Sequence, residues 1–528
     1  MRKLIRIESV FDGWQPSFHF GRKGQFLRSI GIDPDVPLSD SASDIITSGV
    51  IRPVKYAKFS GSNVTGYPIA IFTTPKNALI YAVLSNGRCV SYDSSLGSET
   101  LVFTTSLQTV TGAFYYNNYI YVINDTDIAR YGPLDGTPAL VENVWTGATL
   151  GLQSALTNNQ TLQTRNSVPY LNHPHYVHVD NKAYFCDYKN GQGYVHYVRT
   201  KKTTAEGDTN DGSTYGSPAG ASFLPFNYIP MAIGAYGNDL VIAAALTSNG
   251  SIVQGSCSLF FWDTVSPNFY RAVPIPDAIC TVLRYQNGTL EGLSGNMTGG
   301  VRHFKYLGGD SISTIDYIEE GHPPMQNAAC FFGNRFVWGA FLTYPDNVAG
   351  LMAHGSKSDL FPRGLHHIAV SSLTATSSNG VITAVAAIQQ GAAFPKFIMG
   401  GTDGTNKNLD SQSTTYGTHY FRGPVSNVGR SFTVERISIR LGAAVAANMT
   451  LVPKLFFDNE SSSQAGTTIN TTNYPNGDRL ITLEPADFAR NVAGKNNFYL
   501  ELKWSGTALL PVLLPIDIEI EVEEDPMS

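Results

Sequence analysis

Charge is scarce in this chain of 528 residues. Asp, Glu, Lys and Arg make up 15% of the sequence, and 36 basic against 42 acidic side chains leave a formal net charge of -6. Globular proteins usually carry about a quarter of charged residues. This balance excludes a global electrostatic attraction to nucleic acid or to anionic membranes, so any such contact would have to be local.

Cysteine is also sparse, and its five positions form no CxxC pair: Cys89, Cys186, Cys257, Cys280 and Cys330. Isolated cysteines in strand-like segments indicate small buried side chains in a reducing compartment. Long apolar runs are missing as well, so the sequence predicts no membrane-spanning segment. Arg6 and Glu8 interrupt what would have to be the apolar core of a signal peptide, and none is expected.

Short motifs of common catalytic chemistry are missing from the sequence. P-loop, GxSxG, HExxH and dinucleotide-binding fingerprints do not occur. The candidate metal ligands are His173 and His175 in NHPHYVHVD, which would share one face of a strand, whereas His178 would point to the opposite face. Because no second set of ligands accompanies them, we expect no metal, no cofactor and no catalytic centre.

What the sequence does contain is a repeated pattern of apolar strand, two-residue polar turn and apolar strand. The seven turns are Lys76-Asn77, Asn117-Asn118, Asp180-Asn181, Gly237-Asn238, Asn287-Gly288, Gly333-Asn334 and Asn379-Gly380. Successive turns are 41 to 63 residues apart, close to the length of a four-stranded propeller blade. Asn and Gly accept the positive φ angles that tight hairpin turns need.

A second turn follows about one strand later, for example at Asn86-Gly87 and Asn249-Gly250. The repeat predicts an all-β fold in which residues 56–404 form a propeller of about seven blades. The strand-like segment Tyr56 to Gly61 could pair with the last blade and close the ring. Another β architecture rich in hairpins is the alternative.

Composition changes mark further parts of the chain. Polar inserts at residues 146–170 and 201–220 lengthen early blades, and residues 405–417 are predicted to be a linker. Residues 418–528 alternate apolar and polar side chains with period two, which predicts a β-sandwich. The acidic face of its last strand, Ile516 to Val522, is typical of an exposed edge strand.

Residues 1–55 show little periodicity and are predicted to form an extended amino-terminal arm. Its first 28 residues carry six basic side chains against Glu8 and Asp12. These six are the candidate docking residues: Arg2, Lys3, Arg6, Arg22, Lys23 and Arg28. The arm could bind an acidic neighbour or passing DNA. Alternatively, it is a solvated tail whose aromatic residues pack on the chain's own propeller.

An arm, an irregular propeller with long inserts and a carboxy-terminal sandwich together resemble tail proteins of double-stranded DNA bacteriophages. The segment GIDPDVPLSDSASDIITSGVIRP, residues 31–53, is similar to the turn-rich strap that leads into the first blade of such proteins. In organisation, the chain is similar to the propeller-bearing tail nozzle, or tail stabilisation protein, of short-tailed phages. No individual functional residue can be carried over from this resemblance.

The resemblance implies a structural virion protein in the phage tail, assembled in the bacterial cytoplasm. Copies would form a homo-oligomeric ring, expected to contain six, that extends the DNA channel below the portal and adaptor and holds fibre or plug proteins. The alternative is a receptor- or glycan-binding tail module. A propeller glycoside hydrolase comes after it, because spacing alone does not set the separation of carboxyls such as Asp310 and Asp316.

Overall fold

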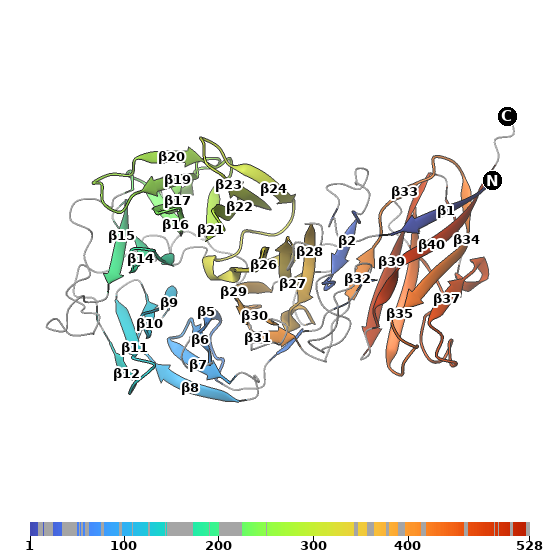
Figure 1. Ribbon diagram of the computed structural model, residues 1–528, viewed down its shortest axis with the longest axis horizontal. Helices are drawn as coiled ribbons and strands as arrows, with labels where there is room; N and C mark the ends of the chain where they lie inside the picture. Colours follow the sequence, from blue (N-terminus) through green and yellow to red (C-terminus); the bar gives the residue numbers. More distant parts are fainter. Residues whose placement is uncertain are drawn as a thin grey trace.

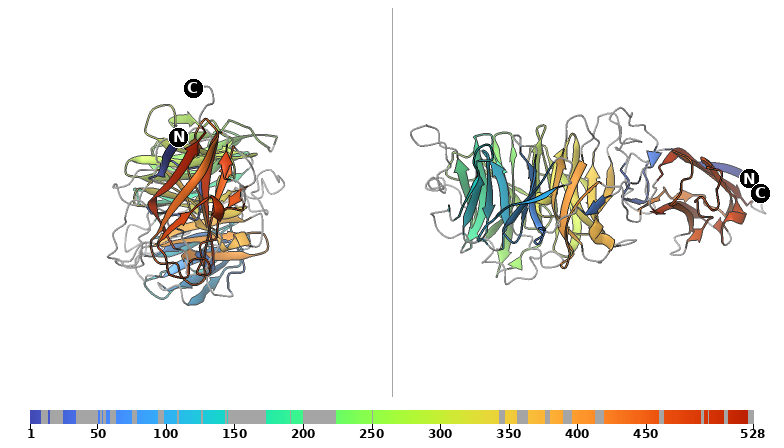
Figure 2. Two further views of the ribbon diagram at one scale, coloured as in Figure 1. Left: turned by 90° about the vertical axis from the view of Figure 1, so that its right-hand side faces the viewer. Right: turned by 90° about the horizontal axis from the view of Figure 1, so that it is seen from below.

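The structure is a computed structural model, and it consists of a β-propeller and a β-sandwich that lie side by side along the long axis (Figures 1 and 2). The described residues are 1–8, 14, 25–33, 50–51, 53, 56–58, 63–74, 79–93, 98–107, 109–124, 127–142, 144, 173–189, 191–199, 224–249, 251–342, 347–355, 364–375, 380–388, 396–412, 419–458, 463–489, 492–494, 496–506 and 510–523. Among them, no helix is long and apolar enough to cross a membrane.

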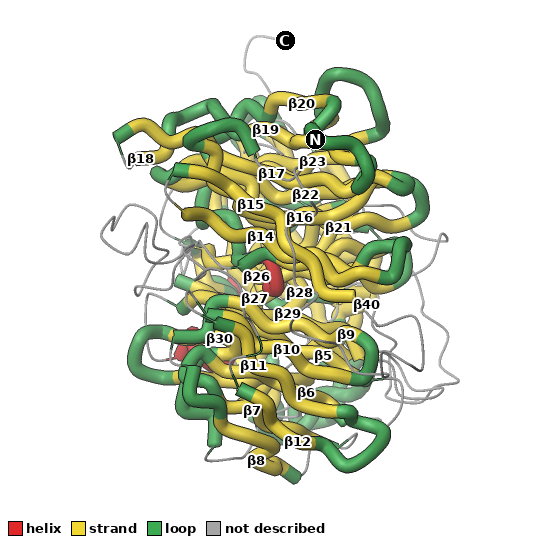
Figure 3. The backbone as a smooth tube through the Cα atoms, turned by 90° about the vertical axis from the view of Figure 1, so that its left-hand side faces the viewer, coloured by secondary structure: helices red, strands yellow, loops and turns green. Residues whose placement is uncertain are grey.

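Seven antiparallel sheets in the described residues surround the propeller axis, and each is one blade (Figure 1). Figure 3 shows the strands of these blades from the side. The first contains β5 (Pro68–Thr73), β6 (Ile80–Leu84), β7 (Arg88–Tyr92) and β8 (Glu99–Thr104), and the second β9 (Gly112–Tyr116), β10 (Tyr119–Ile123), β11 (Ile128–Gly132) and β12 (Ala139–Val141). The third contains β13 (His175–Val177), β14 (Lys182–Lys189) and β15 (Gln192–Arg199). The fourth contains β16 (Tyr228–Tyr236), β17 (Asp239–Ser248), β19 (Ser258–Trp262) and β20 (Arg271–Pro274), with β18 (Ser251–Ile252) beside β17.

The remaining blades complete the ring. The fifth contains β21 (Ile279–Gln286), β22 (Thr289–Asn296), β23 (Gly299–Tyr306) and β24 (Ser313–Ile318). The short 3-10 helix η4 (Gln326–Ala328) leads into the sixth, which contains β25 (Ala329–Phe332), β26 (Arg335–Leu342), β27 (Val348–His354) and β28 (Leu365–Val370). The seventh contains β29 (Val381–Ile388), β30 (Lys396–Thr402), β31 (Lys407–Gln412) and β4 (Tyr56–Lys58).

Five of the predicted turns join the first two strands of a blade: Asn117-Asn118, Asp180-Asn181, Gly237-Asn238, Asn287-Gly288 and Gly333-Asn334. The prediction is wrong for Asn379-Gly380, because Gly380 directly precedes β29, the first strand of the seventh blade. Asn117 and Asn118, between β9 and β10, have φ values of +46° and +66°. Asn287 and Gly288, between β21 and β22, have +51° and +78°. These left-handed angles are the ones that type I′ hairpins require. The residues of each turn therefore determine where the hairpin of that blade forms. Lys76-Asn77, Asn379 and the inserts at 146–170 and 201–220 lie outside the described residues.

The propeller closes through its earliest strand, as the sequence predicts. In β4, Lys58 and Ala57 pair with Asp410 and Ser411 of β31, so the outermost strand of the last blade comes from the start of the propeller. The predicted linker over 405–417 is therefore wrong for Lys407–Gln412. Three polar residues of this strand, Asn408, Asp410 and Ser411, are buried, and partners satisfy them: Asp410 accepts a hydrogen bond from the N–H of Ser372 at 2.8 Å.

Two sheets form the sandwich. The first contains β1 (Arg2–Ile7), β40 (Val512–Val522), β34 (Phe432–Leu441) and β37 (Leu480–Leu483), with β3 (Val50–Ile51) beside β40 and β38 (Ala493–Gly494) beside β34. The second contains β2 (Arg28–Ile30), β32 (His419–Arg422), β39 (Asn497–Gly506), β35 (Met449–Phe457) and β36 (Gln464–Ala465), with β33 (Ser426–Asn427) beside β39. A short 3-10 helix, η6 (Pro485–Asp487), follows β37.

The amino-terminal segment is extended, but its described parts belong to the sandwich. Strands β1, β2 and β3 pair with β40, β32 and β40, respectively, and Ile7, Phe26 and Ile51 are buried in the sandwich core. The propeller is thus inserted between the first and last strands of the sandwich. The edge-strand interpretation of Ile516 to Val522 is wrong, because β40 lies between β1 and β34.

Candidate functional site

Among the predicted docking residues, Arg6 and Arg28 pair with acidic side chains of the chain itself, whereas Arg2 and Lys3 are exposed. Nε of Arg6 donates to Oδ1 of Asp517 at 2.7 Å, and Arg2 stands opposite Glu521 on the neighbouring strand. Arg436 forms the corresponding ion pair with Glu519 from the other side of β40. The acidic face of β40 is therefore flanked by basic side chains of both neighbouring strands, which explains the charge of both segments.

The other docking candidates differ in what they contact. Arg28 forms an ion pair with Glu320, which follows the fifth blade, and its guanidinium lies over the Trp14 ring at 4.9 Å from the centroid. Lys3, although also on β1, stands opposite the apolar Ile520 and is exposed. Arg22 and Lys23 lie outside the described residues.

A clamp joins the sandwich to the outer strand of the sixth blade; we use this name for residues 14 and 25–33 together with β28. The N–H of Gly31 donates to Nδ1 of His367 at 3.1 Å, and the N–H of Ile32 donates to the backbone oxygen of His367 at 3.0 Å. Beside them, Asp33 accepts from both terminal nitrogens of Arg335 at 2.7 and 3.1 Å. Both side chains are almost fully buried, so the two parts are joined through a desolvated ion pair.

The propeller axis is occupied by η4. Nε2 of Gln326 donates to the backbone oxygen of His175 at 2.8 Å, and Nδ2 of Asn327 donates to that of Ile69 at 3.0 Å. Arg284 on β21 donates to the backbone oxygens of Gln326 and Ala329. Helix η4 therefore ties together blades one, three and five, and it fills space that propellers often leave as a central channel.

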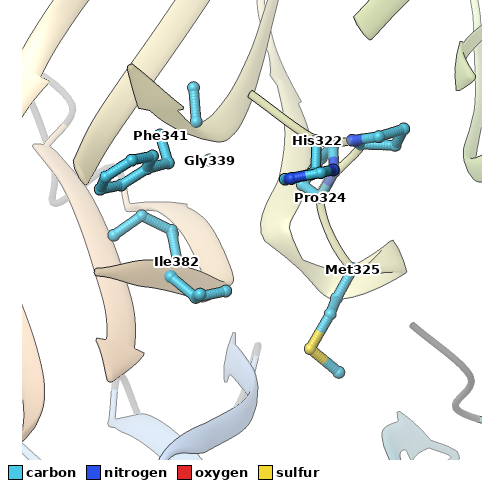
Figure 4. A pocket seen from close by; sticks show the side chains of 9 residues that line it. His322, Pro324, Met325, Gly339, Phe341 and Ile382 are labelled. Carbon is cyan, nitrogen blue, oxygen red and sulfur yellow. The ribbon is translucent and has the colours of Figure 1, made fainter. Parts of the chain in front are cut away.

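A small pocket lies beside η4, between β26 of the sixth blade and β29, the inner strand of the seventh (Figure 4). The side chains of Met325, Phe341 and Ile382 line it together with the ring of His322. Its cavity volume is about 30 Å³, which is room for roughly two water molecules. A sugar ring does not fit a space of this size.

The two histidines predicted as metal candidates are engaged by different partners. Nδ1 of His173 lies 2.7 Å from Oγ1 of Thr111, and its Nε2 lies 3.3 Å from Oδ1 of Asp187. The ring of His175 stacks on Phe114, and burial lowers the pKa of His175 to about 4. The structure therefore uses both rings in the contact between the second and third blades.

A second cluster of titratable groups joins the fifth and sixth blades. On β23, Nε2 of His303 lies 2.8 Å from Oε2 of Glu291, and Nδ1 lies 3.4 Å from Oδ2 of Asp316. The same Asp316 oxygen lies 2.6 Å from Nδ1 of His354 at the end of β27. Nζ of Lys305 lies 2.9 Å from Oε1 of Glu291. We call His303, Asp316, His354 and Glu291 the interblade cluster.

The pKa values of Asp316 and His303 are shifted more by charges and hydrogen bonds within the interblade cluster than by burial. Burial alone would raise the pKa of Asp316, but hydrogen bonds and charges from His303 and His354 hold it well below its usual value. Burial alone would lower the pKa of His303, but Asp316 and Glu291 raise it. In the sequence, Asp316 is only one of several neighbouring acids. His303 and His354 cannot be recognised there as its partners, because their convergence depends on how two blades pack.

Comparison with known proteins adds little to this picture. No family model matches the chain, and no curated protein matches it. Among solved structures, the β-propeller domain of Cps50 (Swd1) from Myceliophteria thermophila has 11% identity and a TM-score of 0.38, and the alignment covers 68% of this chain and 100% of that one. The computationally designed Ika8 protein has 11% identity and a TM-score of 0.36, with 68% and 99% covered.

Proposed function

We propose that this chain is a structural virion protein of a bacteriophage tail whose copies assemble into a ring around the DNA channel. The proposal rests on the resemblance in organisation and on the surface of the sheet edges. The portal or adaptor and the fibre or plug proteins would be its partners, and contact with DNA would be transient. The ring is expected to contain six copies.

The observation that carries the proposal is the exposure of apolar side chains on edge strands. Six such residues, each 42% to 55% exposed, lie on edge strands of the described sheets: Leu4 on β1, Leu101 on β8, Val141 on β12, Val177 on β13, Tyr317 on β24 and Leu480 on β37. An edge strand also presents unpaired backbone N–H and C=O groups. Apolar side chains beside them favour pairing with another copy.

Rigidity supports the same role. The buried Asp33–Arg335 pair and the Gly31–His367 hydrogen bond fix the propeller to the sandwich, and η4 cross-links the inner strands. A ring under load needs subunits that keep their shape, because an interface between rigid copies loses less conformational entropy on assembly.

The test is the mass and shape of the purified chain. Light scattering over a range of concentrations and negative-stain images should show rings of about six copies. The double variant Leu101→Lys/Val141→Lys should assemble less, because it places two charges on neighbouring blade edges. Val265→Lys is the matched control, since Val265 is 86% exposed in the loop between β19 and β20 and not on an edge strand.

Two results would contradict the proposal. One is a chain that stays monomeric at every concentration, and the other is an edge variant that assembles as the parent does. A monomer that binds host-surface polysaccharide on a glycan array would instead favour the receptor- or glycan-binding module.

A further inference from the structure

We propose that His303, Asp316 and His354 bind one divalent transition-metal ion, with Zn²⁺ as the reference ion, between the fifth and sixth blades. Two of the ligands come from neighbouring strands of one blade, β23 and β24, and the third comes from β27 of the next. One ligand atom from each residue can be chosen so that all three lie within 4.8 Å of one another. This site is independent of the proposed tail function.

The separations of the ligand atoms suit a single ion. Bonds of 2.0–2.2 Å to Zn²⁺ place two tetrahedral ligand atoms about 3.4 Å apart. In the structure, Oδ2 of Asp316 lies 3.4 Å from Nδ1 of His303 and 2.6 Å from Nδ1 of His354. An ion between these atoms therefore needs small side-chain rotations and no change in the backbone.

Glu291 supplies the support that a metal-binding histidine needs. Its carboxylate lies 2.8 Å from Nε2 of His303, and Lys305 holds the other carboxylate oxygen at 2.9 Å. A proton on Nε2, donated to Glu291, leaves the lone pair on Nδ1, which faces Asp316 and His354. Carboxylate–histidine–metal arrangements of this kind fix both the tautomer and the ring orientation.

The backbone also departs from regularity at this point. His303 stands opposite Asp316, and the register between β23 and β24 shifts between His303 and Phe304. Bulges of this kind re-aim side chains and are frequent beside functional sites.

Exposure and donor type indicate which ion fits. The side chain of His303 is buried, whereas those of His354 and Asp316 are 14% and 21% exposed, so an ion could enter from solvent and keep a water ligand. Two imidazoles and one carboxylate suit zinc or another first-row divalent metal, whereas Ca²⁺ and Mg²⁺ prefer oxygen ligands. Because the ligands come from two blades, the ion would cross-link the fifth and sixth blades.

The first experiment measures binding to the full chain. After treatment with EDTA and removal of the chelator, calorimetric titration with ZnCl₂ should give one ion per chain, and Zn²⁺ should raise the Tm. Co²⁺ at the same stoichiometry should give the visible absorption of a four- or five-coordinate site. A parent chain that binds no stoichiometric Zn²⁺ would overturn the proposal and leave the cluster as a hydrogen-bonded contact between two blades.

Variants then locate the site. Asp316→Asn and, separately, His354→Gln should each weaken Zn²⁺ binding by more than about 100-fold, beyond the roughly 10–100-fold loss that changes behind a ligand cause. Asp310→Asn is the matched control, since the same chemical change six residues away falls on a fully exposed side chain paired with Arg271. It should bind Zn²⁺ as the parent does.

Circular dichroism of each variant without metal separates loss of binding from loss of folding. A folded Asp316→Asn or His354→Gln chain that keeps the parent affinity would overturn the assignment of that ligand and, with it, the site. Should either variant fail to fold, the stoichiometry and the Co²⁺ spectrum of the parent still decide whether the ion binds.

Discussion

Gly31 is the residue on which the clamp between the two parts depends most directly. Its φ is +65°, and a Cβ atom there would lie 2.3 Å from Cδ2 of His419 and 3.1 Å from Cγ2 of Val370. We expect Gly31→Ala to lower the free energy of unfolding by about 3 kcal/mol or more, from left-handed strain of roughly 1–2 kcal/mol plus overpacking. Chemical denaturation measures the loss.

Gly237 provides the matched control for this substitution. Its φ is +62°, but a Cβ atom there would meet nothing within 4 Å. Gly237→Ala should therefore lower the free energy of unfolding only by the left-handed backbone strain, about 1–2 kcal/mol. Equal losses at the two positions would show that the close contact with His419 does not contribute.

Asp33→Asn tests the buried ion pair of the clamp. The carboxylate of Asp33 and the guanidinium of Arg335 are 6% and 2% exposed, so removing one charge leaves the other without its counter-ion in a desolvated site. We expect a loss of about 3–5 kcal/mol in the free energy of unfolding. Asp310→Asn, at an ion pair whose carboxylate is fully exposed, should leave stability nearly unchanged. A small loss at Asp33 would mean that solvent reaches the clamp.

At the scale of elements, the sequence predicts the turns and strands that depend on local residue chemistry. It does not predict the strands that depend on pairing with distant parts of the chain. The blade hairpins were predictable because Asn and Gly at Asn117-Asn118 and Asn287-Gly288 specify the turn by themselves. Strand β31 is not predictable from the sequence, because three of its buried residues, Asn408, Asp410 and Ser411, are polar. Only contacts with distant groups such as Ser372 make that burial tolerable. The closing strand β4 was predictable because its apolar pattern precedes the first blade.

The amino-terminal strands illustrate the same limit. Basic residues of β1 suggested docking to an acidic partner, and Arg6 does pair with the acidic Asp517, but that partner is the last strand of the same chain. Deleting residues 1–28 would remove Ile7 and Phe26 from the sandwich core, so this truncation would test folding before it tests docking. The interblade cluster was out of reach for the same reason, since 51 residues separate His303 from His354.

Acid should loosen the clamp through His367. Burial, with help from the charges of Arg28 and His419, lowers the pKa of His367 from 6.5 to about 3. The ring is therefore neutral in the folded chain, where Nδ1 accepts a hydrogen bond from the N–H of Gly31. The unfolded chain binds the proton near pH 6.5 and the folded chain only near pH 3, so stability is complete above pH 6.5 and falls as the pH falls through this window.

The size of this effect follows from the shift. Between pH 7 and 4.5, His367 should account for a loss of about 3 kcal/mol in the free energy of unfolding, at 1.36 kcal/mol per pKa unit. Urea denaturation at the two pH values measures it. In His367→Asn, the amide oxygen can still accept from Gly31 but does not titrate, so the acid loss should shrink by about that amount. An unchanged loss would assign the acid sensitivity to other groups, such as His175 and His196.

At the scale of the whole molecule, insertion of the propeller into the sandwich determines which fragments can fold. The chain enters the sandwich through β1, β2 and β3, leaves for the propeller, and returns at β32. Met1 and the end of β40 lie together at the far end of the sandwich (Figure 1). A carboxy-terminal fragment of residues 419–528 lacks all three early strands. It would expose the inner face of β40 and lose Ile7, Phe26, Ile32 and Ile51 from the core.

We expect that fragment 419–528 alone does not fold cooperatively. Joining residues 1–53 to 419–528 through a flexible linker of about a dozen Gly and Ser residues should restore a cooperative thermal transition, because it returns the missing strands as part of the same chain. Circular dichroism and calorimetry of both constructions measure this difference. A fragment 419–528 that unfolds as cooperatively as the linked chain would show that the sandwich is complete without β1, β2 and β3. These strands would then form a separate arm that precedes the propeller.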